Sequence, residues 1–581
     1  MKKNFAVIVL LLTCHLAMAQ GFELRLLNHW DNPDGTVERG YAGRSIWKWE
    51  EIPTNKTPMP AQLKARYEEY GRINQTYGIN GTVLNNVNAK PLALSTDMLK
   101  KTAKIADVLR PYGIKVYLSV NFASPKALGD LDTADPLDKK VQQWWEKKVK
   151  EIYRYIPDFG GFLVKANSEG EPGPMDYGRT HVDGANMLAA ALQPHGGIVM
   201  WRAFVYSAKG GDRANQAYEE FMPFDGQFAD NVIIQIKNGP IDFQPREAVS
   251  PLFFGLKKTK MMVEFQITQE YTGESIHTCF LAPMWHEFFQ QIQTPGEVCN
   301  LVGIAGVANI GDSPNWTAND LAMANWYAFG RLANDPWVSS RTIAEDFLRT
   351  YYTDDPRFVR PITQLLLKSR EAIVDYMMPL GLHHIFAGGH HYGPEPWCAP
   401  AGWREDWLPR FYHRADSIGI GFNRSDHNEP CLAGEQGSNN VSQYPEPLHI
   451  LYNNVNTCPE NLLLWFHHVS WDYTMNNGLS LWDNLCYTYD RGVHQAEEFV
   501  ETWKSVKPYV EHEQYERQLQ RFQRQAKDAQ WWRDACLLYF QQFSHRPLPP
   551  DSPAPHYTLK ELMDYRLNMD NYTAADPARL P

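Results

Sequence analysis

The 581-residue sequence predicts an α/β fold: a (β/α)8 TIM barrel followed by a mainly α-helical C-terminal region. The first indication is a series of short apolar segments that are typical of fully buried strands. There are eight of them, at 24–30, 81–84, 115–121, 161–166, 198–205, 231–237, 261–267 and 303–310. Their onsets are mostly about thirty to fifty residues apart, the length of a strand and a returning helix. A count of eight indicates a closed barrel.

The second indication is the helical pattern between several of these segments. Residues 96–112 form one such pattern and residues 139–155 form another. In the latter, Val141, Trp145 and Val149 recur at helical spacing, which predicts one apolar face turned toward the strands.

The pattern changes after Asn319, where helices follow one another without strands between them. We expect helices at 321–332, 343–352 and 358–377, a loop-rich stretch at 380–442, a short apolar segment at 460–465, and two long helices, the last at about 515–540. The last one carries a clear amphipathic stripe. We therefore divide the chain into a barrel at 20–319 and a helical domain at 320–581.

The first nineteen residues resemble a secretory signal. Met1-Lys2-Lys3 supplies the positive charge, residues 5–12 form a short apolar core, and Ala17-Met18-Ala19 is a typical cleavage motif. We expect cleavage after Ala19 and a periplasmic or secreted protein. No other apolar run approaches the roughly 20 residues that a membrane-spanning helix needs, so no membrane span is expected.

Composition limits the function further. The chain is 44% hydrophobic and 13% aromatic and carries a net charge of −11, which argues against a nucleic-acid partner. The abundant aromatics suit stacking on sugar rings, although large cores use them as well. Of eight cysteines, seven would remain after cleavage, without CxxC spacing, so neither a zinc site nor a complete disulfide framework is predicted.

Charged residues follow the predicted strands at their C-terminal ends, where a parallel barrel places its chemistry. The fourth, fifth, sixth and seventh strands supply, in order, Lys165 and Glu169, Arg202, Lys237 and Asp242, and Glu270. Three cations and three carboxylates are thus expected around one cleft. Carboxylates on different strands suit glycosidic bond hydrolysis. The cations suit a substrate that carries its own carboxylate, unless they pair only with the protein's acids as a structural network.

The segment Lys165-Ala166-Asn167-Ser168-Glu169-Gly170-Glu171-Pro172-Gly173-Pro174 closely resembles the α-glucuronidases of glycoside hydrolase family 67. The resemblance extends over nearly the whole mature chain, through 27–32, 40–43, 177–186, 237–242, 264–271 and 532–536. It implies inverting release of (4-O-methyl-)α-D-glucuronic acid from xylan-derived oligosaccharides, without a metal or organic cofactor.

The resemblance also implies roles for the residues that match the family's motifs. Glu169 would be the general acid, with Glu171 as a weaker alternative. Asp242 and Glu270 would hold and deprotonate the attacking water, and the choice of base between them stays open. Lys165, Arg202 and Lys237 would bind the uronate and neighbouring hydroxyls. An inverting pair is expected about 6.5–9.5 Å apart, which leaves room for water.

Two groups of residues have competing interpretations. Trp30 or Trp47 is expected to form an aromatic floor under the sugar, or else to be a core or rim aromatic. The pairs His383/His384, His390/His391 and His467/His468 lack HExxH spacing, so we predict no metal site. The mixture of His, Gly, Pro and Trp at 382–397 is more simply a loop over the cleft.

Family members usually carry a β-rich N-terminal domain before the first barrel strand, and here Leu24 follows the expected cleavage site closely. The chain is therefore expected to lack that domain. The alternative functions are a catalytically impaired, secreted barrel that binds uronic acid or xylo-oligosaccharides, and a retaining hydrolase of neutral sugars. Expected partners are a glucuronoxylan-derived oligosaccharide and a second copy of the chain in a homodimer.

Overall fold

The computed structural model describes residues 21–31, 44–204, 211–267, 270–293, 298, 300–308, 310–389, 391–426 and 436–565. Several sequence predictions fall outside these residues: the signal at 1–19, the motif positions 32 and 40–43, Val205, Thr268, Gln269, His390, Cys299 and Cys431. The cysteines at 279, 398, 458, 486 and 536 are buried, as small core residues are expected to be.

Eight parallel strands close into a barrel in the order of the sequence, which confirms the predicted fold class. The strands are β1 (Leu24–His29), β2 (Gly81–Val83), β3 (Lys115–Ser119), β4 (Gly161–Val164), β5 (Ile198–Arg202), β6 (Val232–Lys237), β7 (Met261–Gln266) and β8 (Leu301–Ala308). Closure is made by β1 and β8, which pair in register from Leu24 opposite Gly303 to His29 opposite Ala308.

Each strand contributes an apolar side chain to the interior of the barrel. These inward residues are Leu26, Val83, Tyr117, Leu163, Met200, Ile233, Met262 and Ala305. The alternate residues of the same strands face the outer helices, so both faces are apolar. A strand buried on both faces is a continuous apolar run, which is why the eight strands could be found in the sequence.

The helices that surround the barrel are α2 (Ala61–Tyr77), α3 (Thr96–Leu109), α4 (Ser124–Gly129), α5 (Lys139–Tyr155), α6 (His181–Leu192), α7 (Arg213–Phe221), α8 (Leu252–Gly255), α9 (Ala282–Gln293) and α10 (Met323–Asn334). Helix α10 lies past residue 319 but packs on the barrel, where Trp326 meets the rings of Tyr70 and Tyr77 of α2. Helix α10 therefore packs as part of the barrel. The domain boundary between residues 319 and 320 stays a prediction.

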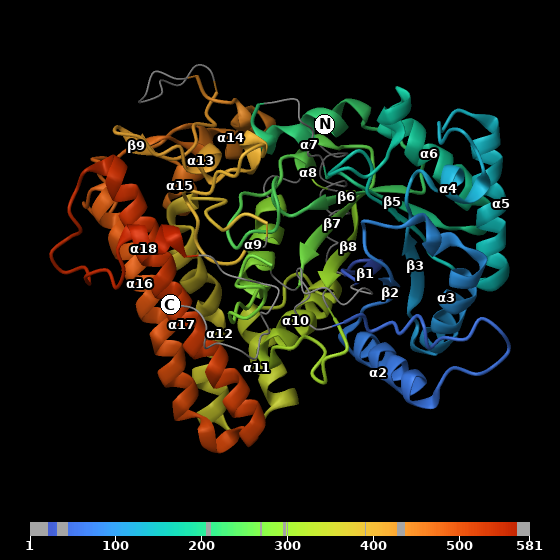
Figure 1. The fold of residues 1–581 in the computed structure, drawn as a ribbon, viewed down its shortest axis with the longest axis horizontal. Helices are drawn as coiled ribbons and strands as arrows, with labels where there is room; N and C mark the ends of the chain where they lie inside the picture. The colour runs from blue at the N-terminus through green and yellow to red at the C-terminus, as the bar shows by residue number, and fades with distance from the viewer. Residues whose placement is uncertain are drawn as a thin grey trace, which may run out of the picture.

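The C-terminal region lies to one side of the barrel (Figure 1). Its long helices α12 (Pro356–Met377), α16 (Leu481–Ser505) and α17 (His512–Ser544) pack together, with α11 (Ser340–Tyr351) beside α12. Shorter elements complete it: α13 (Pro409–His413), α14 (Glu446–Asn453), α15 (Leu463–Phe466), α18 (Leu559–Asp564), and the two-stranded sheet of β9 (Gly419–Ile420) and β10 (Val469–Ser470). The predicted helices are all present.

Buried polar contacts join the C-terminal region to the barrel. Arg424 binds Asp212, with Nε to Oδ2 at 2.8 Å, and the ring of His277 lies 2.8 Å from Asp528 of α17. Both carboxylates are almost fully buried, and a buried charge is tolerated only with such a partner. These contacts hold the loops of the C-terminal region in place over the barrel.

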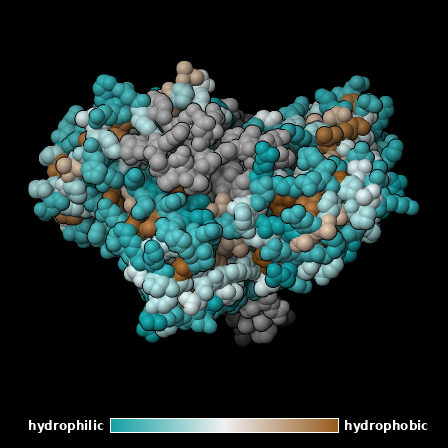
Figure 2. All heavy atoms as spheres, turned by 60° about the horizontal axis from the view of Figure 1, so that its bottom comes forward, coloured by the Kyte–Doolittle hydropathy of each residue, from teal (hydrophilic) through white to brown (hydrophobic). Residues whose placement is uncertain are grey.

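The surface is mainly hydrophilic on the face shown in Figure 2, with hydrophobic residues in small, separate patches. Within the described parts of the chain, none of the helices combines the length and the apolar character that a bilayer crossing requires.

Candidate active site

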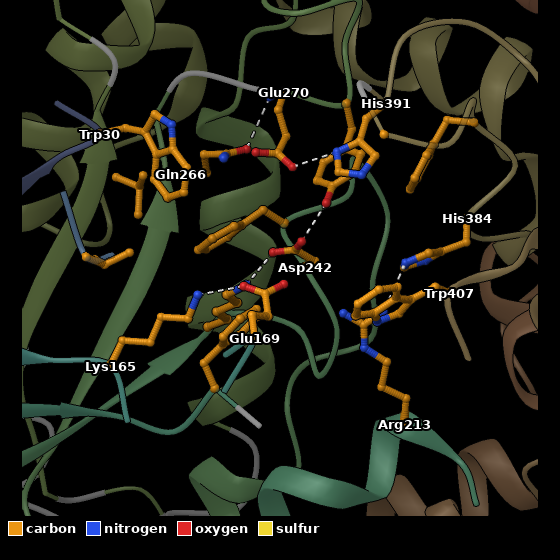
Figure 3. A pocket seen from close by; sticks show the side chains of 18 of the residues that line it. Trp30, Lys165, Glu169, Arg213, Asp242, Gln266, Glu270, His384, His391 and Trp407 are labelled. Atoms are coloured by element: carbon orange, nitrogen blue, oxygen red, sulfur yellow. Dashed lines mark hydrogen bonds and ion pairs between the residues drawn. The ribbon is translucent and has the colours of Figure 1, made fainter. Parts of the chain in front are cut away.

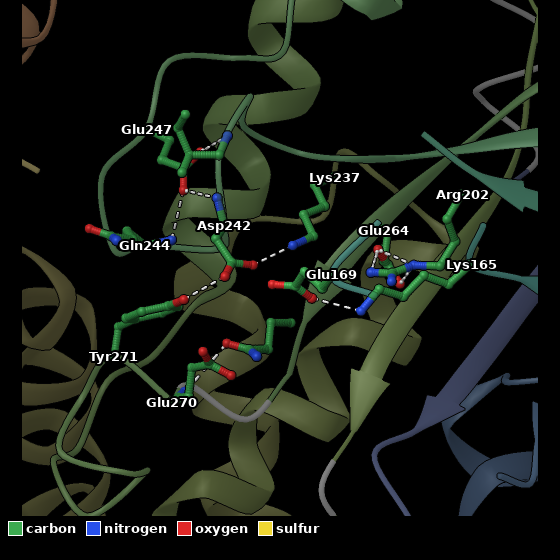
Figure 4. Close-up of polar contacts among 12 residues, drawn as sticks. Lys165, Glu169, Arg202, Lys237, Asp242, Gln244, Glu247, Glu264, Glu270 and Tyr271 are labelled. Atoms are coloured by element: carbon green, nitrogen blue, oxygen red, sulfur yellow. Dashed lines mark hydrogen bonds and ion pairs between the residues drawn. The ribbon is translucent and has the colours of Figure 1, made fainter. Parts of the chain in front are cut away.

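Strand β4 delivers the first pair of charged residues to the C-terminal end of the barrel. Lys165 follows the strand directly, and its side chain is only 3% exposed. Its ammonium donates to Glu169 Oε2 at 2.6 Å and to Asn88 Oδ1 at 2.8 Å. Glu169 is 38% exposed and faces the open cleft (Figure 4).

The backbone around Glu169 adopts a conformation that side chains rarely accept. Asn167 and Glu169 have φ of 53° and 50°, in the left-handed region, and Gly170 follows at 81°. Asn167 holds this turn, because its Oδ1 accepts from Met175 N at 3.0 Å and its Nδ2 donates to Asp176 Oδ1 at 2.9 Å. Such non-glycine outliers are concentrated at functional sites. Here the outlier aims the Glu169 carboxylate at the cleft.

Strands β5 and β7 supply a buried, bidentate ion pair. Arg202 ends β5 and donates through Nε to Glu264 Oε1 at 3.1 Å and through Nη2 to Oε2 at 2.7 Å. Glu264 also accepts from Asn28 Nδ2 of β1 at 3.3 Å. The planar guanidinium group matches the two oxygens of a carboxylate through two parallel hydrogen bonds. The Nη1 group of Arg202 does not take part in this ion pair.

Strand β6 ends in Lys237, which forms an ion pair with Asp242. The second oxygen of Asp242 accepts from the Tyr271 hydroxyl at 2.5 Å. The Lys237 ammonium also lies 3.4 Å from the centroid of the Phe204 ring, a cation–π contact that holds it at the floor of the cleft. Lys237 is 6% exposed and Asp242 is 20% exposed, so the carboxylate is the more accessible member of the pair.

Glu270 lies across the cleft from Glu169 and beside Asp242 (Figures 3 and 4). Its Oε1 is 3.0 Å from Nδ1 of His391, and its backbone N–H donates to Gln266 Oε1 at 3.4 Å. The His391 ring stacks on Tyr271, with centroids 5.0 Å apart. One histidine of the C-terminal region therefore touches both the ring that binds Asp242 and the carboxylate of Glu270.

The two tryptophans proposed as a sugar platform lie in different environments. Trp30 directly follows β1, is half-buried and lines the cleft. Trp47 is only 1% exposed and packs among His29, Tyr67 and Tyr70, away from the cleft lining. A ring enclosed in this way has no face open to a sugar. Trp47 is therefore a core aromatic, and Trp30 remains the candidate platform.

The cleft thus brings together seven of the eight residues that the sequence singled out: Trp30, Lys165, Glu169, Arg202, Lys237, Asp242 and Glu270. Its volume is about 230 Å³. Glu171, the alternative acid, is not among the lining residues, and it accepts from Asn121 Nδ2 at 3.2 Å.

One wall of the cleft was not identified from the sequence. Segment 384–409 of the C-terminal region contributes His384, Phe386, Gly388, Gly389, His391, Cys398, Trp403, Trp407 and Pro409. Arg213, at the start of α7, joins this wall with Nη1 3.3 Å from the Tyr412 hydroxyl. The high density of His, Gly, Pro and Trp at 382–397 was the available signal. That signal predicted a loop over the cleft, which agrees with the structure, but it did not identify which residues of the loop line the cleft.

Electrostatics in the cleft follow from burial and pairing. Burial lowers the pKa of Lys165, opposed by the nearby Glu169 carboxylate and reinforced by Arg202. Burial likewise lowers the pKa of Lys237. For Asp242, burial alone would raise the pKa, but the Lys237 ammonium and the Tyr271 hydroxyl outweigh it and hold the pKa below its usual range. Asp242 is thus an anion across the ordinary pH range.

The charged side chains of the cleft form matched pairs. Lys165, Lys237 and Arg202 each pair with one carboxylate: Glu169, Asp242 and Glu264, respectively. Among the described residues, no group of three or more His, Cys, Asp and Glu side chains is arranged to hold a metal ion. The chemistry this arrangement offers is proton transfer by carboxylates next to an anion-binding floor.

Sequence comparison places both parts of the chain in one enzyme family. The middle domain of glycosyl hydrolase family 67 matches residues 12–316, and the C-terminal domain of that family matches residues 317–552. Similar proteins include Alpha-glucuronidase A of Emericella nidulans, 41% identical over 555 residues, and Alpha-glucuronidase of Hypocrea jecorina, 39% identical over 551 residues. Each match covers 90% of this chain and 63% of the relative. The chain thus spans less than two thirds of the length of these relatives.

A solved structure shares the fold at low sequence identity. It is that of a GH138 enzyme targeting pectin rhamnogalacturonan II, with a TM-score of 0.50 and 12% identity. The match covers 91% of this chain and 60% of that chain. The likeness extends beyond the barrel into the C-terminal region, and it concerns the fold alone.

Proposed function

Because the chain belongs to glycosyl hydrolase family 67, we propose that it is an α-glucuronidase. It removes (4-O-methyl-)α-D-glucuronic acid from xylan-derived oligosaccharides by inverting hydrolysis. The observation that carries this proposal is the meeting of three cations and three carboxylates at one cleft. A neutral sugar has no use for so many buried cations, whereas a uronate pairs with them.

Glu169 acts as the general acid. It is the most exposed carboxylate of the charged set, it faces the cleft, and its backbone turn fixes its direction. Its proton passes to the glycosidic oxygen as the bond from that oxygen to the anomeric carbon breaks. The xylo-oligosaccharide leaves as a neutral alcohol.

Asp242 and Glu270 hold the attacking water on the opposite face of the sugar. One of them takes a proton from the water as its oxygen bonds to the anomeric carbon, and the other orients it. Tyr271 and His391 support this pair, because the first binds Asp242 and the second lies against Glu270. The product is glucuronic acid in the β configuration.

Lys165, Lys237 and Arg202 bind the uronate and neighbouring hydroxyls, and Trp30 stacks on the sugar ring. The substrate carboxylate competes with Glu169 and Asp242 for the two ammonium groups, which form ion pairs with those residues. Substrate binding thereby frees the Glu169 carboxyl from its ion pair and leaves it available to the glycosidic oxygen.

The setting of this activity is part of the same proposal. Residues 1–19 serve as a secretory leader cleaved after Ala19, so that the enzyme meets soluble xylan fragments in the periplasm or outside the cell. The chain works as a monomer or a homodimer on glucuronoxylan-derived oligosaccharides. No metal or organic cofactor takes part.

A carboxyl-reduced substrate tests the proposal directly. We expect the enzyme to release glucuronic acid from a short aldouronic oligosaccharide, and to cleave the matching α-glucosyl compound at least roughly 100-fold less efficiently, because that compound offers no carboxylate to the three cations. The measurement is kcat/KM for both compounds by product chromatography. Equal efficiency on the neutral compound would contradict a uronate-specific site, and no release from either would favour the binding-barrel alternative.

A further inference from the structure

The turn that carries Asp242 is organised around a single buried carboxylate, that of Glu247. Its Oε1 accepts from Asp242 N at 3.0 Å and from Gln244 N at 2.9 Å, and its Oε2 accepts from Ile241 N at 3.1 Å. The side chain of Glu247 is 0% exposed. It lies on the side of the turn that faces away from Glu169 and Glu270 (Figure 4). Unlike Asp242, it does not line the cleft.

The geometry of the turn explains why it needs an acceptor with a charge. Phe243 has φ of 54°, in the left-handed region, so the amides on either side of it converge instead of alternating. Converging N–H groups form a concave anion site, and an unsatisfied buried amide is costly. The Glu247 carboxylate fills this site from within the same chain segment and so stabilises the strained Phe243 conformation.

Gly239 shows how closely the turn wraps this carboxylate. A Cβ added at Gly239 would lie 2.0 Å from Glu247 Oε2 and 2.5 Å from Glu247 Cβ. Only glycine permits this approach of backbone to side chain. The segment from the end of β6 to Glu247 is therefore a closed loop around one side chain, with Asp242 on its cleft side.

Two histidines of the C-terminal region cover the turn. His383 Nε2 lies 3.5 Å from Glu247 Oε1. The backbone N–H of His384 donates to Gln244 Oε1 at 3.3 Å, and Gln244 Nε2 lies 3.1 Å from the His384 ring. The turn is thus held by the Glu247 carboxylate and by the loop that also carries His391. Because the Glu247 side chain is fully buried, it cannot move into solvent.

We infer that Glu247 is a positioning residue: it holds the Asp242 turn so that Asp242 faces the attacking water. The inference rests on the function proposed above, in which Asp242 holds that water. Glu247 touches neither the cleft nor Lys165 and Arg202, so it sets the reactive geometry more than substrate affinity. A small misplacement of a reacting group lowers kcat without a matching loss of binding.

The test compares Glu247→Gln and Glu247→Ala with a matched control, Asp225→Asn. Asp225 also gathers three backbone amides, those of Lys257, Lys258 and Thr259, at 2.9–3.1 Å. That turn precedes β7, at the opposite end of the barrel from the cleft. Each variant thus alters a carboxylate that accepts from three backbone amides, but only one of the two carboxylates supports Asp242.

Steady-state kinetics on an aldouronic oligosaccharide, with thermal unfolding of each variant, separate the outcomes. We expect kcat to fall roughly 10-fold in Glu247→Gln, which keeps one acceptor oxygen, and roughly 100-fold in Glu247→Ala, with KM within about threefold of wild type. Asp225→Asn is expected to keep kcat and KM within about twofold of wild type, whatever its melting temperature.

A wild-type kcat in folded Glu247→Gln and Glu247→Ala would overturn the inference, as would an equal loss in Asp225→Asn, which would indicate a general effect of lost stability. If Glu247→Ala does not fold, the contrast between Glu247→Gln and Asp225→Asn still decides. Failure of the proposed function has a different signature, since the wild-type enzyme would then release no glucuronic acid.

Discussion

Glu169→Ala is expected to lose nearly all turnover of an aldouronic oligosaccharide, by roughly 10²–10⁴-fold in kcat, because the leaving oxygen then has no proton donor. Binding of the product glucuronic acid should persist, since Lys165, Lys237 and Arg202 remain. Removing Glu169 also leaves Lys165 without the carboxylate 2.6 Å away, which favours a ligand carboxylate in its place. The measurements are kcat by release of glucuronic acid and the dissociation constant of glucuronate by calorimetry.

Glu171→Gln is the matched control for that variant. Glu171 lies two residues further along the same loop, and burial raises its pKa, opposed by Lys165. It accepts from Asn121 at 3.2 Å and does not line the cleft. We expect this variant to retain most of the wild-type kcat. Full activity in Glu169→Ala, or a loss seen only in Glu171→Gln, would transfer the role of acid from Glu169 to Glu171.

Asp242→Ala and Glu270→Ala are each expected to lower kcat by roughly 10²–10⁴-fold, because a positioned base contributes about that much and the water is held by both carboxylates. Added azide should restore turnover in the variant that lacks the base, since azide attacks without giving up a proton. The product of that reaction should be the β-glucuronosyl azide. Product analysis by NMR identifies both the base and the face of attack.

Two results would contradict these assignments. Wild-type kcat in either variant would remove that carboxylate from the mechanism, and an α-azide product would place the attack on the wrong face for inversion. Tyr271→Phe provides a graded comparison, because it removes the hydroxyl that donates to Asp242 at 2.5 Å and leaves the carboxylate in place. Its kcat should fall less than that of Asp242→Ala.

The barrel was predictable because its strands are buried on both faces and therefore appear as apolar runs. Strand limits agree to within three residues, and the helix expected at 139–155 is α5, from Lys139 to Tyr155. Asp138 caps that helix, with its side chain accepting from Lys140 N at 2.7 Å. The last helix was predicted too short, at 515–540, because α17 continues to both sides of its apolar stripe, from His512 to Ser544.

The charged residues of the cleft were predictable because a parallel barrel brings the C-terminal ends of its strands together. The cleft residues that come from the irregular loop at 384–409 could not be predicted. Such a loop has no repeating pattern from which the positions of His384, His391 or Trp407 could be inferred. Glu247 was missed for a different reason: glutamate is expected at the surface, and nothing in the sequence shows that three amides surround it. The sequence left two interpretations of Trp47 open, because a tryptophan suits a core and a sugar platform equally.

The most direct test of the account is the configuration of the sugar at the moment it is released. Proton NMR on an aldouronic oligosaccharide during the first turnovers, before mutarotation, distinguishes the two anomers of free glucuronic acid. Acid and base carboxylates on opposite faces of the bond predict β-glucuronic acid as the first product. Initial α-glucuronic acid would contradict the assignment of Glu169, Asp242 and Glu270 to an inverting site.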